Sequence, residues 1–383
     1  LESGGTLRIE SNFTSVRLPD DFRNDINDNR ILQICVGLAP TCSSLILVTK
    51  DIMVRLKAQS LGIPAEDFTN EQSPSIKEQY TGRMDVYAPD ESINSFRKKG
   101  IPPQEIYIIQ DEKRFPVSPV PNQFFIIHSE TSDKKTVLGR FDGKNVIPLK
   151  YLKEKPFGVC PRNVGQRFLQ EALMLSAQEA PLVIVKGAAG TAKTFYSLAV
   201  GLQRTFEKDS KKYRKILITR PNVQFDDDIG FLPGSEQDKI APLLRPVIDN
   251  LELLVDQDDG ERYRNEKELS GKVEELFARG IVTTEAMNFI RGRSISQTYL
   301  IIDEAQNLTP KQAKGLITRV GSGTKVILLG DPMQIDNPLL DERTNGLSYA
   351  SDRMKGSPLC FQITMKSEEC ERSDLAYDAA SRM

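Results

Sequence analysis

The chain has 383 residues, of which 39% are hydrophobic and 27% charged, and its 51 basic and 53 acidic side chains leave a formal net charge of -2. This length predicts two or three domains. The balanced charge neither indicates nor excludes a polyanionic partner, because nucleic-acid binding depends on a local basic surface. The single histidine, His128, argues against histidine metal clusters and Ser/His/Asp triads, so we expect carboxylates, hydroxyls or phosphates to hold any metal.

The sequence contains no run of about 20 apolar residues that could form a membrane helix, and no signal segment opens the chain. We therefore expect a cytoplasmic protein without a membrane partner. The five cysteines lack the close paired spacing of a zinc site, which indicates reduced thiols. Because the chain starts at a leucine within a segment typical of a domain interior, we also expect that upstream sequence is missing.

Residues 1–72 are predicted to form part of an α/β domain. The apolar spacing predicts a helix at 31–38, a strand at 45–48 and a helix at 51–61, followed by a polar linker at 69–76.

Residues 73–155 are predicted to form a small β-rich connector. Strand-like runs at 106–109, 124–128 and 137–141 are separated by proline or Asp-Gly turns, of which Asp142-Gly143 is one.

From residue 156 to 383 the pattern changes to helices between fully apolar strands. Val164, Phe168, Ala172 and Leu175 recur at helical spacing, and strands are expected at 182–186, 216–219, 299–302 and 325–329. Continuous apolar strands suit a sheet that is covered on both faces. The fold class predicted for this part is a doubly wound, parallel-sheet α/β domain.

A phosphate-binding loop is predicted between the strand at 182–186 and a helical run at 193–205. Its sequence is Gly187-Ala188-Ala189-Gly190-Thr191-Ala192-Lys193-Thr194. The glycines let backbone N–H groups turn around the phosphates of ATP, Lys193 would reach the terminal phosphates, and the Thr194 hydroxyl would bind Mg²⁺. Ala192 replaces the usual glycine, and its methyl group restricts the loop dihedrals. The alternative is a strand-to-helix turn that carries these residues by chance.

Two further strands predict the rest of the ATP site. The strand at 299–302 delivers Asp303, which would hold Mg²⁺, and Glu304, which would orient and activate the attacking water. After the strand at 325–329, Gln334 is placed to sense the terminal phosphate and to couple hydrolysis to movement. The alternatives are acids that only cap the next helix and a solvated turn glutamine.

Arginines emerge beside these strands. Arg220 follows the strand at 216–219, and Arg291 and Arg293 precede the acidic strand. They could contact nucleic-acid phosphates or stabilise transition-state charge, or they could simply be solvated.

Three of these segments, at 220–234, 303–307 and 330–336, resemble the PhoH family of ATPases, whose members look like the nucleotide-binding core of superfamily 1 helicases. The resemblance covers residues 161–383. It implies that Asn163 and Gln166 contact adenine, that Arg372 is an arginine finger acting within one subunit or across an interface, and that the protein assembles into a homo-oligomer such as a hexameric ring. RNA is the partner that it implies.

The front of the chain looks like the back half of a PIN ribonuclease domain, on the segments at 27–32 and 48–51. The resemblance implies that Asp28 and Asp51 belong to a carboxylate cluster that holds Mg²⁺ or Mn²⁺ and generates the nucleophilic water for RNA cleavage. The family's opening strand and first aspartate have no match here. As an alternative, an aspartate in the first turn of a helix stabilises that helix without any metal.

The interpretation that joins these motifs is an ATPase that unwinds RNA or moves along it, linked to a PIN domain. An ATP-dependent regulatory or assembly factor that remodels a protein partner is the alternative. A nucleotide-binding module without turnover is a third interpretation, which the joint presence of Lys193 and Glu304 disfavours.

Overall fold

The computed structural model describes residues 6–13, 15–19, 22, 27–68, 72–132, 135–207, 213–221, 236–258, 266–290 and 295–370. The chain divides into two compact units, Leu1–Gln72 and Ser73–Met383. Within the described part of the chain, no helix is long and apolar enough to cross a membrane.

The first unit is a small α/β arrangement. Its elements are α1 (Asn27–Leu38), β1 (Leu47–Val48), α2 (Ile52–Ser60) and β2 (Ala65–Glu66). β1 and β2 are parallel neighbours, so α2 is the crossover between them. Leu32, Val54 and Ala58 are buried where the two helices meet. The predicted helices and strand are confirmed, with ends shifted by a few residues.

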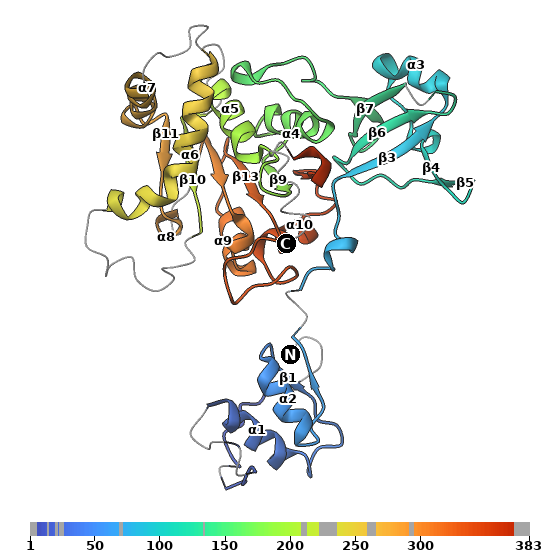
Figure 1. The fold of residues 1–383 in the computed structure, drawn as a ribbon. Coiled ribbons are helices and arrows are strands. Elements are labelled where there is room, and N and C mark those ends of the chain that lie inside the picture. The colour runs from blue at the N-terminus through green and yellow to red at the C-terminus, as the bar shows by residue number, and fades with distance from the viewer. Residues whose placement is uncertain are drawn as a thin grey trace. The chain divides into compact units, whose positions relative to one another are not determined.

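The second unit begins with a mixed sheet whose described strands follow the order β5-β4-β3-β6-β7-β8 (Figure 1). The elements are β3 (Arg83–Ala88), α3 (Asp90–Lys99), β4 (Tyr107–Gln110), β5 (Lys113–Pro116), β6 (Phe124–Ser129), β7 (Thr136–Phe141) and β8 (Val146–Pro148). Ile93 and Phe96 of α3 pack on one face of this sheet. The sequence does not predict α3, because Ile93 and Phe96 are the only buried residues of this helix and its apolar pattern is therefore sparse.

The second sheet of this unit is wholly parallel among its described strands, in the order β11-β10-β12-β13-β9-β14. The strands are β9 (Leu182–Lys186), β10 (Lys215–Thr219), β11 (Val282–Thr284), β12 (Thr298–Ile302), β13 (Lys325–Gly330) and β14 (Cys360–Thr364). The helices are α4 (Val164–Met174), α5 (Lys193–Phe206), α6 (Glu236–Asp258), α7 (Glu266–Ala278), α8 (Met287–Ile290), α9 (Pro310–Ile317) and α10 (Gly346–Arg353).

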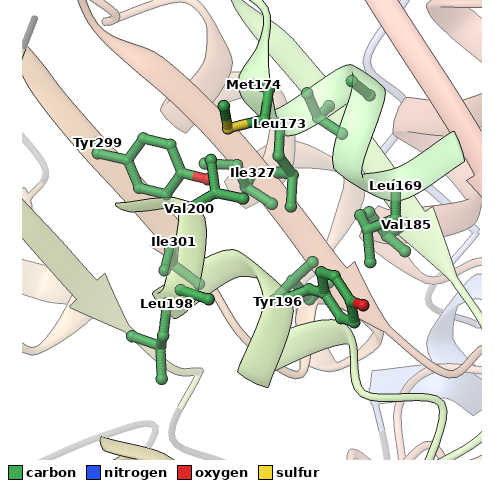
Figure 2. Packing of buried hydrophobic residues seen from close by; sticks show 14 of the residues in the cluster. Leu169, Leu173, Met174, Val185, Tyr196, Leu198, Val200, Tyr299, Ile301 and Ile327 are labelled. Atoms are coloured by element: carbon green, nitrogen blue, oxygen red, sulfur yellow. The ribbon is translucent and has the colours of Figure 1, made fainter. Parts of the chain in front are cut away.

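Alternate residues along the strands of this sheet point to opposite faces and pack into two different hydrophobic cores. Val183 and Val185 of β9 pack with α4, α5 and α6, whereas Leu182 and Ile184 pack with α9 and α10. Figure 2 shows the first core, in which Leu169 of α4 and Tyr196 of α5 lie among strand residues. Helices therefore cover both faces, which confirms the predicted doubly wound α/β domain.

The first sheet of the second unit packs against α4 and against β14, the edge strand of the second sheet. The rings of Phe124 on β6 and Phe168 on α4 are stacked with centroids 4.7 Å apart. The Thr364 backbone N–H donates to the Thr81 carbonyl at 2.8 Å. The β-rich part and the parallel-sheet part thus form one compact unit.

Strand order decides where a site can form. β9 precedes the predicted phosphate loop, and β12 carries the two acids at its end. β13 lies between these two strands. Because parallel strands end at the same edge of the sheet, the segments that follow β9, β13, β12 and β10 are neighbours there.

Candidate active site

The loop from Gly187 to Thr194 joins β9 directly to α5. The Thr191 hydroxyl donates to the Ala188 carbonyl at 2.8 Å and closes the turn. At Gly187, an added Cβ would lie 2.6 Å from the Met365 Cβ, so this position has no room for a side chain. Ala192, the departure from the usual pattern, is the N-cap of α5 and has left-handed backbone angles, φ 63° and ψ 25°. That conformation costs an L-residue roughly 1 kcal/mol or more, a cost that glycine does not have.

Lys193 places its ammonium group inside this loop. Its Nζ donates to the carbonyls of Gly187 at 2.6 Å and Ala188 at 2.8 Å. Burial lowers the pKa of Lys193, while the nearby charges of Asp331 and Asp303 act in the opposite direction. The cation therefore lies between the loop and the acids of the neighbouring strands, where a terminal phosphate of ATP would meet it.

Thr194 and Asp303 bring two oxygen ligands together. The Thr194 hydroxyl donates to Asp303 Oδ1 at 3.2 Å, across 109 positions of sequence. Burial and the neighbouring Glu304 raise the pKa of Asp303, and Arg220 and the Thr194 hydroxyl counteract part of that rise. A hydroxyl and a carboxylate are the ligands that Mg²⁺ takes from a protein while phosphates and water complete its shell, so these residues fit that ion.

Glu304 follows Asp303 in a left-handed backbone conformation, with φ 52°. Its Oε1 accepts a hydrogen bond from Arg220 Nη2 at 2.7 Å, and its Oε2 accepts one from Gln306 Nε2 at 2.6 Å. A non-glycine residue with positive φ is uncommon, and such outliers cluster at functional sites. The carboxylate has a defined direction because it is held at both oxygens.

Gln306 is a site residue to which the sequence analysis assigned no role. It is fully buried. In addition to its bond with Glu304, Gln306 makes a hydrogen bond to each end of the turn after β13. Its Nε2 donates to the Gln334 carbonyl at 2.8 Å, and its Oε1 accepts from the Asp331 N–H at 3.1 Å. At Gly330 an added Cβ would lie 2.2 Å from that Oε1. Gln306 therefore fixes the acidic segment to the end of β13.

Asn307 makes a second connection between the same segments. Its Nδ2 donates to Asp336 Oδ2 at 3.0 Å, and its Oδ1 accepts from the Asp336 N–H at 2.8 Å. The motifs at 303–307 and 330–336 are thus one hydrogen-bonded structure.

These groups surround a cleft of about 310 Å³. The predicted residues that line it are Ala189, Gly190, Ala192, Lys193, Thr194, Arg220, Asp303, Glu304 and Gln334. Pro246 and Asn250 of α6 also line it, and no sequence motif marks them. Gln334 is exposed at this edge, and its backbone is the part that bonds Gln306.

Asn163 and Gln166, the predicted adenine contacts, lie at the start of α4. Asn163 is the N-cap, with its Oδ1 accepting from the Gln166 N–H at 2.9 Å, and its Nδ2 donates to the Glu369 carbonyl at 3.2 Å. The next residue, Cys370, has its Sγ 3.3 Å from the Ala189 carbonyl of the phosphate loop. The chain at 369–370 therefore bridges α4 and the loop, and the adenine contact stays a prediction.

Other predicted residues lie outside this cluster. Arg291, Arg293 and Arg372 are outside the described residues, as is the segment at 222–235. Of the predicted arginines, Arg220 is therefore the one whose surroundings are described.

In the first unit, Asp51 caps α2, and its Oδ1 accepts from the N–H groups of Met53 at 2.7 Å and Val54 at 3.1 Å. Asp28 lies in the first turn of α1. Among the described residues, no three acidic, histidine or cysteine side chains are grouped to hold a metal ion. The metal-binding role of Asp28 and Asp51 stays a prediction.

Comparison with known proteins gives matches to two family models. The model described as PhoH-like protein matches residues 158–382, and a PIN domain model matches residues 1–69. The protein PhoH2 of Bacillus subtilis is 38% identical, over 99% of this chain and 83% of its own length. PhoH2 of Mycolicibacterium smegmatis is 29% identical, over 97% of this chain and 78% of its own length. A PhoH-like protein of Bacillus subtilis is 35% identical, over 57% of this chain and 63% of its own length.

Proposed function

Because this chain belongs to the PhoH family, we propose that it hydrolyses ATP with Mg²⁺ and couples that hydrolysis to unwinding of RNA or to movement along single-stranded RNA. One observation carries the ATPase part of the proposal. The residues predicted for phosphate binding, metal binding and water activation come from separate segments of the chain, and they line one cleft at the carboxyl edge of a parallel sheet.

Each residue has a task that fits its position. Backbone N–H groups at the start of α5 and the Lys193 ammonium would bind the phosphates of ATP. Thr194 and Asp303 would hold Mg²⁺, which neutralises phosphate charge when it is bound. Glu304 would orient a water molecule and accept its proton, since its side chain is 31% exposed and lines the cleft. Gln334, at the rim, would sense the terminal phosphate.

The RNA part of the proposal rests on the family's likeness to superfamily 1 helicases and on Arg220, which lines the cleft with a side chain that is 28% exposed. The PIN match at 1–69 supports a second proposed activity, RNA cleavage with Mg²⁺ or Mn²⁺. Translocation needs two surfaces that move relative to each other. We therefore also propose self-assembly, in which a neighbouring subunit supplies the second surface.

The test is the steady-state ATPase rate of the chain alone, with single-stranded RNA and with single-stranded DNA, over a series of salt concentrations. We expect RNA to raise the rate and added salt to weaken that stimulation, since phosphate contacts release counterions. Equal rates under all three conditions would refute RNA coupling and favour remodelling of a protein partner. An absence of turnover with Mg²⁺ and ATP would refute the ATPase itself.

A further inference from the structure

The ion pair between Arg220 and Glu304 engages the carboxylate that ATP hydrolysis would need. Arg220 Nη2 lies 2.7 Å from Oε1, and Gln306 Nε2 lies 2.6 Å from Oε2. A guanidinium group stabilises the ionised carboxylate and competes with a water molecule for it. In this arrangement Glu304 is both aligned and restrained.

The two donors differ in how easily they can leave. Gln306 is fully buried and is bonded to the backbone of Asp331 and Gln334, so it cannot move without breaking the turn after β13. Arg220 follows the last residue of β10, and its side chain is 28% exposed at the cleft. Arg220 can therefore change partners without opening the core, whereas Gln306 cannot.

An ion pair that is this exposed is weak enough to be exchanged. Pairs between partly solvated charges change an equilibrium constant by only about two- to fivefold. A phosphate group offers the same planar guanidinium two oxygens, often in a bidentate contact. A polyanion bound along the cleft edge would thus compete effectively for Arg220.

We propose that Arg220 is a positioning residue that restrains Glu304 when no RNA is bound, and that a backbone phosphate of single-stranded RNA takes over Arg220 and frees Glu304. Gln306 continues to hold the other oxygen, so the freed carboxylate stays aimed at the cleft. This inference rests on the proposed function, because it takes Glu304 as the general base and RNA as the partner. It explains how one segment could link RNA binding to hydrolysis.

The test compares the full chain with Arg220→Gln, and with Arg220→Met as a second variant that keeps the apolar stem. Both variants lose the ion pair, so we expect the ATPase rate without RNA to rise about two- to fivefold. Adding single-stranded RNA should then give little further increase. Arg279→Gln is the matched control, since Arg279 directly follows α7, pairs with Glu275 of that helix at 3.1 Å and does not line the cleft. It should keep both the rate without RNA and the stimulation.

The outcomes separate the inference from the function on which it rests. An RNA-free rate in folded Arg220→Gln or Arg220→Met that is unchanged or lower would overturn the restraint, and a lower rate would assign Arg220 to the transition state. A raised rate with stimulation intact would overturn the release by RNA. If the unmodified chain is not stimulated by RNA but the variants are faster, the restraint holds and the proposed RNA partner fails.

Discussion

Gln306 provides a test of whether the site depends on one buried amide. Gln306→Glu keeps the shape of the side chain and the oxygen that accepts from the Asp331 N–H. It replaces the Nε2 donor by a second oxygen, which would face Glu304 Oε2 at 2.6 Å and the Gln334 carbonyl at 2.8 Å. The new carboxyl group is fully buried beside the Glu304 carboxylate, so it takes up a proton at neutral pH, and its O–H can serve only one of the two acceptors. The other hydrogen bond becomes a contact between two oxygens.

The size of the effect follows from these contacts. A buried acceptor that loses its donor costs about 1–3 kcal/mol. Glu304 is 31% exposed and can turn partly toward water, so the Gln334 carbonyl should dominate the cost. We expect the free energy of unfolding to fall by about 1–3 kcal/mol, which for the compact unit Ser73–Met383 lowers the midpoint of thermal unfolding by roughly 2–5 °C.

The assay is thermal unfolding followed by circular dichroism, beside the steady-state ATPase rate. Gln312→Glu is the matched control, because within the described part of the chain the Gln312 side chain bonds through its oxygen alone, which accepts from the Thr309 N–H at 2.8 Å in the capping box of α9. Glutamate serves equally well there. Equal unfolding midpoints for Gln306→Glu and Gln312→Glu would refute the view that the Gln306 donor holds Glu304 and the turn after β13 together.

Two further predictions concern the loop and the metal ligand. Ala192→Gly removes the cost of a left-handed alanine but adds flexibility to the unfolded chain. We therefore expect the free energy of unfolding, measured by urea denaturation, to rise by a net amount of about 0.5–1 kcal/mol. A loss of stability would show that the methyl group makes a favourable contact. The raised pKa of Asp303 predicts that protons compete with Mg²⁺ at a higher pH than at an ordinary aspartate. The Mg²⁺ concentration for half-maximal ATPase should therefore rise as the pH falls toward the folded-state pKa of Asp303, and a value that stays constant down to the lowest pH at which the protein remains folded would contradict this.

Some of the site could be predicted because local sequence determines it. The short apolar runs at 182–186 and 299–302 are typical of strands in a sheet covered on both faces, and the residues that follow such parallel strands meet at one edge. On that basis the sequence predicts that Lys193, Thr194, Asp303 and Glu304 lie together. The structure places all four at one cleft.

The pairing of Arg220 with Glu304 could not be predicted, because it depends on strand order. Thr219 of β10 lies opposite Ile302 of β12, so the residues that follow these two are neighbours. Nothing local in the sequence states that β10 and β12 are adjacent while β13 separates β12 from β9. The contribution of Asn250 to the cleft was missed for the same reason, since α6 reaches the site through tertiary packing.

The role of Gln306 was missed for a different reason. Glutamine is usually exposed, and a glutamine after two acids has no distinctive spacing. The feature of the sequence that points to Gln306 lies at the end of β13, where Gly330 leaves room for the Gln306 side-chain oxygen. A glycine at the end of a buried strand indicates a close approach, but it does not say which residue approaches.

Glu304→Gln tests the central claim most directly, because it changes one oxygen of the proposed base and keeps its shape. Binding of a fluorescent ATP analogue and ATP turnover with single-stranded RNA would be measured on the same sample. We expect nucleotide affinity within about threefold of the unmodified chain, since Lys193 and the loop supply that binding, and turnover reduced about 10²- to 10⁴-fold. Turnover that survives the substitution would contradict the assignment of Glu304 and, with it, the mechanism proposed for this cleft.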